Sequence, residues 1–322
     1  MQKTYIKLIP FVMISTILTL VAVIMMSHSV RAAQAPVDLQ TAAPFAILSG
    51  AEISDAGNTS VITGNVGLSP ATGADIGLFC SQVTGAIYSV DAGGPSPCRI
   101  TNGPLLVTAK NNLTAAYVDA AGRTPLTTVS TELGGTTLVA GVYDSLSTTF
   151  GITAGAGALV LDGQNDPSSV FIFQAPFSGT GLNVGSASTI TLVNGAQACN
   201  IFWRVDTAAI NSTANFKGTI LALNSITVAN GATIEGRLLA RNGNVTLIND
   251  TITVPTCASV VTPGGGSGAT PTVDDGTPTA PNTSVRASSA PDAAVPLLSA
   301  SLVFATIVVA LGYILKITHK RK

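Results

Sequence analysis

The stretch FKGTILALNSITVANGATIEGRLLARNGNVTL, residues 216–247, decides the fold because it contains two copies of one unit. The segment TILAL from Thr219 recurs eighteen residues later as RLLA from Arg237, and SITV from Ser225 recurs as NVTL from Asn244. A period of about twenty residues, with short strands separated by small residues, is typical of a β-solenoid whose coils stack on one another.

The same order of segments extends back to Gly141, which makes five coils up to Val254. In each coil a strongly apolar segment, such as IFWRV from Ile201, precedes two segments in which apolar and polar residues alternate. This period of two predicts which side chains point inward. In the second segments these are Ile152, Leu182, Val184, Ile210, Ile226, Val228, Val245 and Leu247, and in the third segments they are Leu159, Leu161, Ile190, Leu192, Phe216, Ile234 and Ile252. The sequence therefore predicts a mainly β protein, folded as a three-sided β-helix.

Residues 104–122 have the pattern of a helix. Pro104 suits the first helical position and Gly122 suits the end. The apolar residues form one stripe at helical spacing, made of Leu105, Leu106, Ala109, Leu113, Ala116, Tyr117 and Ala120. Because the first segment of each coil is apolar on both faces, it needs a cover, and we expect this helix to supply it. Residues 71–103 are irregular, and we expect them to cap one end of the stack.

Composition excludes several classes of function. Only 10% of the residues are charged and the net charge is −1, whereas nucleic-acid binding needs a basic surface. The two histidines, His28 and His319, lie near the ends, so the body of the chain has none for nucleophilic catalysis or a zinc site. Carboxylates with the paired spacing of a glycosidase are also missing among Asp144, Asp162, Asp166, Asp206 and Glu235. We expect no enzyme activity, no metal and no cofactor.

Four cysteines, an even number, indicate disulfides in an exported chain. Four cysteines allow three pairings. We expect Cys80 to pair with Cys98, because the two are close in sequence and flank a segment rich in glycine and proline. Cys199 and Cys257 would then hold the last coils together. Metal binding is the alternative, but the sequence contains no CxxC motif.

The two ends of the chain carry export and anchoring signals. Residues 1–33 have early lysines, a long apolar run and small residues, as a signal peptide does, although an uncleaved anchor is the alternative. After a folded domain at 34–258, residues 259–294 have the composition of a disordered linker. Residues 295–317 are apolar enough to span a membrane, and the basic residues 318–322 mark a cytoplasmic end.

A short motif lies within the linker, at residues 280–284. Ala280, Pro281, Asn282, Thr283 and Ser284 resemble the LPxTG motif by which sortase attaches proteins to the cell wall, with alanine in place of leucine and serine in place of glycine. Cell-wall attachment and a plain membrane anchor therefore stay open as alternatives. In both cases we expect a monomeric domain displayed at the cell surface.

Several blocks of the sequence resemble the ice-binding protein family of the DUF3494 type. They are FAILSGAEIS (45–54), VITGNVGLSP (61–70), AYVDAAGR (116–123), LDGQNDPSSVFIFQ (161–174), NGAQACNIFWRV (194–205), the 216–247 stretch and TITVPTC (251–257). The resemblance implies a right-handed, discontinuous β-helix with a long helix along one side. It also implies adsorption to ice through a flat, regular face.

Two outward rows of small polar residues compete for that role. The row on the second segments is favoured because it carries no charge, and it comprises Thr153, Asn183, Asn211, Ser225, Thr227, Asn244 and Thr246. The row on the third segments is interrupted by Glu235, and it comprises Thr189, Thr191, Thr213, Asn215, Thr233, Thr251 and Thr253. Threonine is also a good strand former, so either row can be an ordinary solvated surface. An adhesive or structural surface module on the same scaffold is the competing function.

Overall fold

The computed structural model describes residues 34–175 and 181–258. These residues belong to one compact unit. The predicted signal peptide, linker, sorting-like motif, membrane span and basic tail lie outside the described residues. No helix in the described part of the chain is long and apolar enough to cross a membrane.

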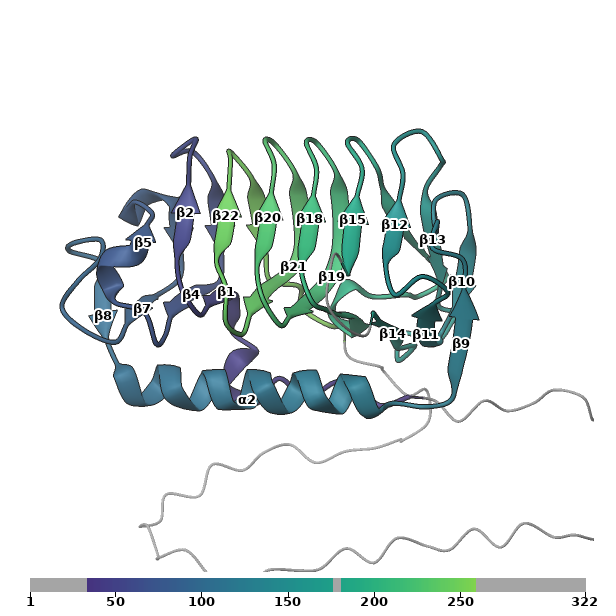
Figure 1. The fold of residues 1–322 in the computed structure, drawn as a ribbon, viewed down its shortest axis with the longest axis horizontal. Helices are drawn as coiled ribbons and strands as arrows, with labels where there is room; N and C mark the ends of the chain where they lie inside the picture. The colour runs from purple at the N-terminus through teal and green to yellow at the C-terminus, as the bar shows by residue number, and fades with distance from the viewer. Residues whose placement is uncertain (1–33, 176–180, 259–322) are drawn as a thin grey trace, which may run out of the picture. The chain divides into compact units, whose positions relative to one another are not determined.

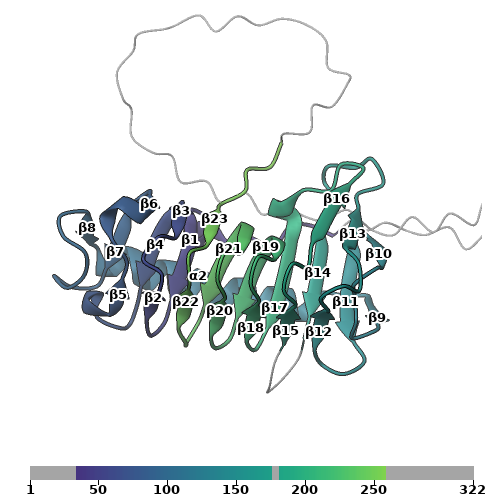
Figure 2. The same cartoon turned by 90° about the horizontal axis from the view of Figure 1, so that it is seen from above.

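The described residues wind into stacked coils whose strands form three walls (Figures 1 and 2). The first wall contains, in spatial order, β8 (Arg99–Thr101), β7 (Ile87–Ser89), β4 (Asn65–Leu68), β1 (Phe45–Ser49), β21 (Thr233–Ala240), β19 (Asn215–Ala222), β17 (Ile201–Val205), β14 (Phe171–Gln174), β11 (Gly141–Ser145) and β9 (Leu126–Val129). The second wall is a sheet of seven strands, β12 (Phe150–Ile152), β15 (Leu182–Val184), β18 (Ala208–Ile210), β20 (Ile226–Val228), β22 (Val245–Leu247), β2 (Ile53–Asp55) and β5 (Ile76–Gly77).

The third wall has two parts. One is a separate sheet of β10 (Thr137–Val139), β13 (Leu159–Asp162) and β16 (Ile190–Val193). The other joins the first halves of β19 and β21 to β23 (Thr251–Thr253), β3 (Val61–Thr63) and β6 (Val83–Thr84). Among the described residues, the short 3-10 helix η1 (Gln40–Ala42) precedes β1, and three others, η2 (Gly73–Asp75), η3 (Cys80–Gln82) and η4 (Ala198–Asn200), lie between strands. The strand pairings within the described parts of the three walls are all parallel, as expected of a β-helix.

Strands β19 and β21 pass from the third wall into the first without a break. Their bends lie at Gly218 and Gly236, which are paired across the two strands. Gly218 has a φ of +109°, and a side chain on Gly236 would collide with the carbonyl oxygen of Gly218. Glycine is therefore required at this corner, because two coils approach each other there backbone to backbone.

The interior is filled by the side chains that the period of two assigns to it. All the predicted inward residues of the second and third walls are buried, except Leu192, which is partly exposed. Aromatic rings form a column along the stack, in which Phe173 and Trp203 lie parallel with ring centroids 3.8 Å apart. Phe150 meets both rings edge-on. Trp203 is fully buried in this column, so its ring offers no platform for a sugar.

Helix α2 (Gly103–Gly122) covers the outer face of the first wall (Figure 1). Its start is capped by Asn102, whose Oδ1 accepts a hydrogen bond from the Leu105 amide at 3.1 Å, and proline follows at the second helical residue. The predicted stripe is buried against Leu48, Phe202 and Leu239, except for Leu105, which is partly exposed. The expected cover of the apolar wall is thus confirmed.

The order of the strands in space differs from their order in sequence. The first coil docks on the last one, through β1 with β21, β2 with β22 and β3 with β23. Residues 71–103 then add a further coil through β5, β6 and β7, so they are more regular than the capping segment expected from sequence. Helix α2 returns the chain to the opposite end, where β9 begins the remaining coils. The contact between the first and the last coil is called the seam below.

The cysteines form two disulfides in the expected pairing. Cys80 is bonded to Cys98, and Cys199 is bonded to Cys257. The first bond lies in the additional coil of residues 71–103. The second ties η4 to the segment that follows β23, and so links the third wall to the last described residues.

Candidate functional site

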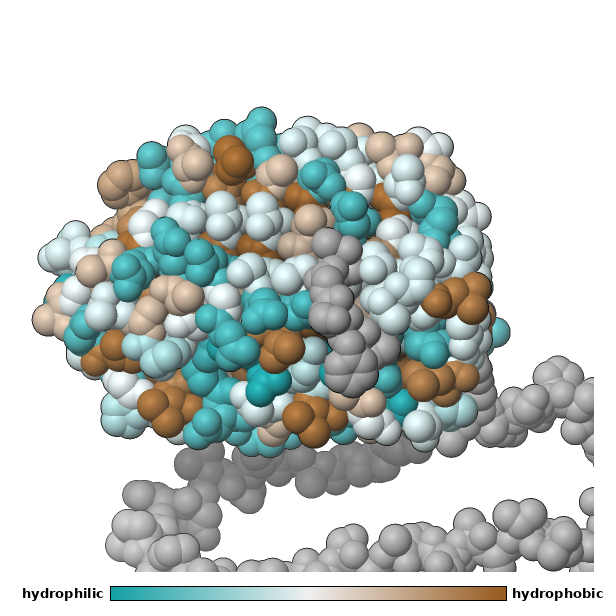
Figure 3. Space-filling view, in the orientation of Figure 1, coloured by the Kyte–Doolittle hydropathy of each residue, from teal (hydrophilic) through white to brown (hydrophobic). Residues whose placement is uncertain are grey.

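The outer face of the second wall carries a central row of small, uncharged residues. Strand register places Gly151, Asn183, Ala209, Thr227, Thr246, Ser54 and Gly77 side by side in this row. Neighbouring strands of a sheet lie about 4.8 Å apart, so the row repeats at that spacing. Figure 3 shows this side of the molecule, where white residues of intermediate hydropathy run across the strands.

Of the seven residues of the favoured row, three lie on strands of this wall and four lie just outside the strand ends. Asn183, Thr227 and Thr246 belong to the central row. Ser225 and Asn244 stand two residues before it, and Thr153 and Asn211 stand two residues after it. These four residues lie one position beyond the ends of three-residue strands, so they belong to the corners that flank this wall. The favoured ice-binding row stays a prediction.

Hydrogen bonds hold several of these side chains in place. Asn211 donates to Asn183 Oδ1 at 3.1 Å and to the Val184 carbonyl at 2.8 Å. Ser225 Oγ accepts the amide of Asn244 at 3.2 Å. Neighbouring coils are thus linked through the side chains of Asn211 and Ser225, which limits the rotamer freedom of these two residues.

Sequence reasoning missed two carboxylates at the edges of this face. Glu132 forms an isolated bridge with Gly151 beyond the last strand, and its carboxylate accepts hydrogen bonds from the amide and the hydroxyl of Thr153. Desolvation opposes ionisation of Glu132, but the bonds from Thr153 and from the Gly134 amide together lower its pKa. Glu52 accepts from Asn244 Nδ2 at 3.1 Å near the other end. The expected absence of charge therefore holds for the central row alone.

Ser54 was also missed, for a topological reason. It lies in the first coil, and only the seam places it beside Thr246. The order of the coils in the sequence does not predict that Ser54 and Thr246 are neighbours. The block FAILSGAEIS, which contains Ser54, was identified by its resemblance to the family and was not assigned to a wall.

The outer face of the third wall is more strongly charged than expected. Lys217 and Glu235 are paired across β19 and β21, with Nζ and Oε2 2.9 Å apart. Thr253 and Thr63 continue the same row. A second row contains Thr189, Asn215, Thr233, Thr251 and Val61. Thr191 lies on β16 and pairs with Val160 in the separate sheet.

Thr213 does not belong to the third-wall face as predicted. It has a φ of +58° in the corner before β19, where its hydroxyl donates to the Ser212 carbonyl at 2.6 Å. The alternation of polar and apolar residues in TANF is the same for a strand and for a corner that leads into one, so sequence pattern does not separate the two.

The described residues show no group of side chains that could hold a metal ion. No cluster of three or more His, Cys, Asp or Glu side chains with metal-binding geometry occurs in residues 34–175 and 181–258. Asp162 accepts from the Gln164 amide at 2.8 Å and from Asn194 Nδ2 at 2.9 Å, and Asp166 accepts from the Ser168 amide at 2.8 Å. The Ser168 hydroxyl also donates to Asp166, at 2.6 Å. These bonds hold turns and lower the pKa of both carboxyl groups, with the Gln164 amide the largest cause for Asp162 and the Ser168 hydroxyl the largest cause for Asp166.

Comparison with known proteins gives a consistent result. The family model of ice-binding-like proteins matches residues 47–253. An ice-binding protein of Colwellia sp is 44% identical over 224 residues, covering 68% of this chain and 84% of the relative. An ice-binding protein of Flavobacterium frigoris is 43% identical over 223 residues, covering 68% of this chain and 76% of the relative.

Solved structures agree with the fold. The crystal structure of an ice binding protein from an Antarctic biological consortium has a TM-score of 0.60 at 35% identity, covering 70% of this chain and 94% of that one. The DUF3494 domain of a Shewanella frigidimarina ice-binding protein has a TM-score of 0.61 at 29% identity, covering 70% of this chain and 100% of that one. The chain belongs to the ice-binding-like family.

Proposed function

We propose that this protein binds ice through the outer face of the second wall. The observation that carries the proposal is the uncharged central row, which continues in register across all seven strands of that sheet. Membership of the family supports it, since the relatives named above are ice-binding proteins.

The physical argument concerns water. Small hydroxyl, amide and methyl groups at a spacing of about 4.8 Å can each hold or shape one ordered water without disrupting its neighbours. A charged group binds its own hydration shell strongly, and removing that shell is costly. The third wall carries Lys217 and Glu235 in the middle of its face, whereas the carboxylates of the second wall lie near its ends. The second wall is therefore the better surface for ordered water.

The test is a pair of matched substitutions on the two walls. Thr227→Tyr places a bulky side chain in the central row of the second wall, and Thr233→Tyr places the same side chain on the third wall; both threonines are exposed. Thermal hysteresis and inhibition of ice recrystallisation are measured for each variant. We expect Thr227→Tyr to abolish most of the activity and Thr233→Tyr to retain it.

Circular dichroism establishes that both variants are folded before activity is compared. The reverse result, with activity lost only in Thr233→Tyr, would assign ice binding to the third wall. A folded wild-type protein without hysteresis or crystal shaping would contradict ice binding itself.

We propose further that the protein acts without catalysis and outside the cell, displayed through its C-terminal region. The two disulfides support an oxidising compartment. The sequence of residues 1–33 supports export, and that of residues 259–322 supports an anchor in the membrane or the cell wall. Fractionation of cells with and without residues 295–322 would test the anchor, because the truncated protein should be recovered in the medium.

A further inference from the structure

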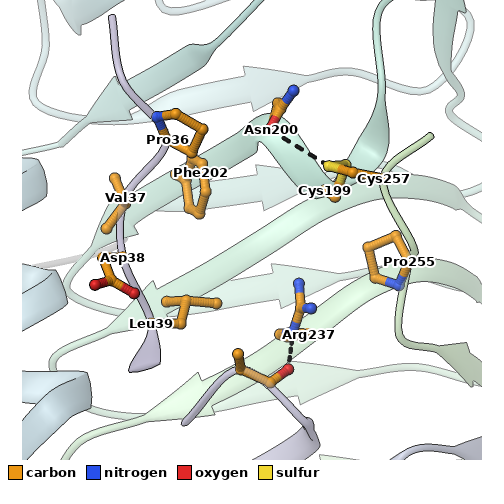
Figure 4. A pocket seen from close by; sticks show the side chains of 11 residues that line it. Pro36, Val37, Asp38, Leu39, Cys199, Asn200, Phe202, Arg237, Pro255 and Cys257 are labelled. Carbon is orange, nitrogen blue, oxygen red and sulfur yellow. Dashed lines mark hydrogen bonds between the residues drawn. A yellow bond between two sulfur atoms is a disulfide. The ribbon is translucent and has the colours of Figure 1, made fainter. Parts of the chain in front are cut away.

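A pocket lies on the outer side of the first wall, away from the second wall. Its volume is about 450 Å³, within the range of small-molecule sites. The segment before β1 forms one side of it with Pro36, Val37, Asp38, Leu39 and Ala43. The rest of the lining is Cys199, Asn200, Phe202, Arg237, Pro255 and Cys257 (Figure 4).

Arg237 is the buried cation of this pocket. Its side chain belongs to β21, and the residue is 8% exposed. Nε donates to the Ala43 carbonyl at 2.7 Å, and Nη1 donates to Thr219 Oγ1 at 3.3 Å. A guanidinium has five N–H donors, so hydrogen bonds to the protein use fewer than half of them.

The described residues provide no carboxylate partner for Arg237. Their two ion pairs are Arg123 with Asp119 and Lys217 with Glu235. Asp38 lines the same pocket, but its carboxylate accepts the Gln40 amide at 3.0 Å and forms no ion pair with Arg237. Burial lowers the pKa of Arg237 to about 10, so the group is still charged at neutral pH. A buried charge without a partner is costly, and an anion in the pocket would offset that cost.

The remaining surface of the pocket is mainly apolar. Val37, Leu39 and Phe202 are 3%, 6% and 2% exposed, and they face the space beside Arg237 (Figure 4). Asn200 is 4% exposed, and its Oδ1 is 3.6 Å from Cys257 Sγ, which has no hydrogen to donate because it is in a disulfide. A ligand that fits these walls has one anionic group and a short apolar body.

From this arrangement we propose that the pocket binds a small organic carboxylate, with the carboxylate on Arg237 and the apolar body against Val37, Leu39 and Phe202. The planar guanidinium matches a carboxylate through two parallel hydrogen bonds. This site is independent of ice binding, since it lies on the first wall and shares no residue with the central row of the second wall.

The test uses benzoate as the probe, titrated into the full-length chain by calorimetry. Benzamide, which has nearly the same shape without the charge, and sulfate, which has charge without an apolar body, are titrated in parallel. We expect benzoate to bind and both others to bind at least about tenfold more weakly, since each lacks one half of the interaction. Equal affinity for benzamide or sulfate, or no binding of benzoate, would overturn the proposal.

Three variants locate the site. Arg237→Gln should weaken benzoate binding about tenfold or more, because the charge-assisted pair is lost. Lys217→Gln removes a cation outside the pocket and should leave binding unchanged. Asp38→Asn removes the carboxylate near the ligand and should tighten binding at low salt.

Asp38 is exposed, and asparagine can still accept the Gln40 amide, so the Asp38→Asn variant should fold even if Arg237→Gln does not. Unchanged benzoate affinity in folded Asp38→Asn at low salt would place the ligand elsewhere and refute the assignment.

Discussion

At the scale of single residues, the neighbours of each side chain on the second wall follow from strand register. Ser54 is paired with Thr246, and Thr246 is paired with Thr227, so the three hydroxyl groups form a continuous segment of the central row. If this row meets ice as a unit, its members should respond alike to a bulky substitution, whichever coil supplies them.

Ser54→Tyr should therefore reduce thermal hysteresis to the same extent as Thr246→Tyr. The physical reason is that both side chains would lift the ice surface away from the same rows of the wall. Thermal hysteresis of the two variants, at equal concentrations of folded protein, checks this. Full activity in Ser54→Tyr with loss in Thr246→Tyr would mean that the contact ends at the seam.

Lys110 provides a prediction about pH. Its Nζ donates to the carbonyls of Ala240 and Arg241 at 2.7 and 2.6 Å, where helix α2 meets the end of β21. Burial, together with the charge of Arg241, lowers the pKa of Lys110 from 10.5 to about 7. Between these two values the unfolded chain binds a proton that the folded chain has lost, so this group makes the unfolding free energy rise with pH.

Lys110→Met removes that contribution. Relative to the variant, the wild type should gain about 1–2 kcal/mol of unfolding free energy between pH 7 and pH 9.5, less than the full shift implies because two carbonyls also favour the charged amine. Urea unfolding at a series of pH values measures the difference. Parallel pH profiles of the two proteins would contradict a lowered pKa at this site.

At the scale of elements, helix α2 and the first wall depend on each other. The helix buries one stripe against the wall, and it shares the cover of the apolar outer side chains of β1, β14, β17, β19 and β21 with the segment before β1, through Val37, Leu39 and Ala42. The stability of the helix should therefore come mainly from this packing, as is usual for helices in proteins.

Leu113→Ala tests this dependence. Leu113 is fully buried between the helix and the wall, so its truncation should cost about 2–5 kcal/mol through lost burial and a cavity. Val107 lies on the same helix but is 54% exposed, and Val107→Ala should change stability by less than about 0.5 kcal/mol. Urea unfolding followed by circular dichroism compares the two. Equal losses would show that packing on the wall is not what stabilises the helix.

Most elements could be predicted from sequence because their signals are local. The repeat from Thr219 to Arg237 locates strands, and the stripe from Leu106 to Ala120 locates the helix. Corners are harder to predict than strands. Thr213 is an example, because the pattern of polar and apolar residues does not indicate its left-handed backbone conformation. Lys217 is absent from the predicted row because it lies two residues after Asn215, where β19 approaches its bend.

At the scale of the whole molecule, the seam is what sequence could not provide. Its pairs, such as Ile47 with Leu238 and Ile62 with Ile252, join the first coil in the sequence to the last one. A buried network of Asp55, Ser60 and Gln82 lies beside it, with Gln82 Nε2 and the Ser60 amide donating to Asp55. Nothing in a local pattern specifies which coil another coil will meet, because every coil presents similar strands.

The two disulfides differ in what they contribute to the whole molecule. The Cys199–Cys257 bond closes a loop of 58 residues, and the Cys80–Cys98 bond closes one of 18. By chain entropy the longer loop should contribute roughly 4 kcal/mol and the shorter roughly 3 kcal/mol. Replacing each cysteine pair by serines, and measuring the free energy of unfolding in urea, shows which disulfide stabilises the protein more. A larger loss from the Cys80–Cys98 pair would show that strain or residual structure in the unfolded chain decides instead.

The first and the last described residues lie close together, since Pro36 and Cys257 line the same pocket. Strand β23 also leads into the last described residues on the side opposite the second wall (Figure 2). A dye, a fusion partner or a solid support attached at either end would therefore meet the back of the domain, and freezing water could approach the second wall freely. The same proximity suits circular permutation, with new ends opened at the exposed turn around Leu146, which does not line the pocket and follows β11, four strands from the seam strand β21.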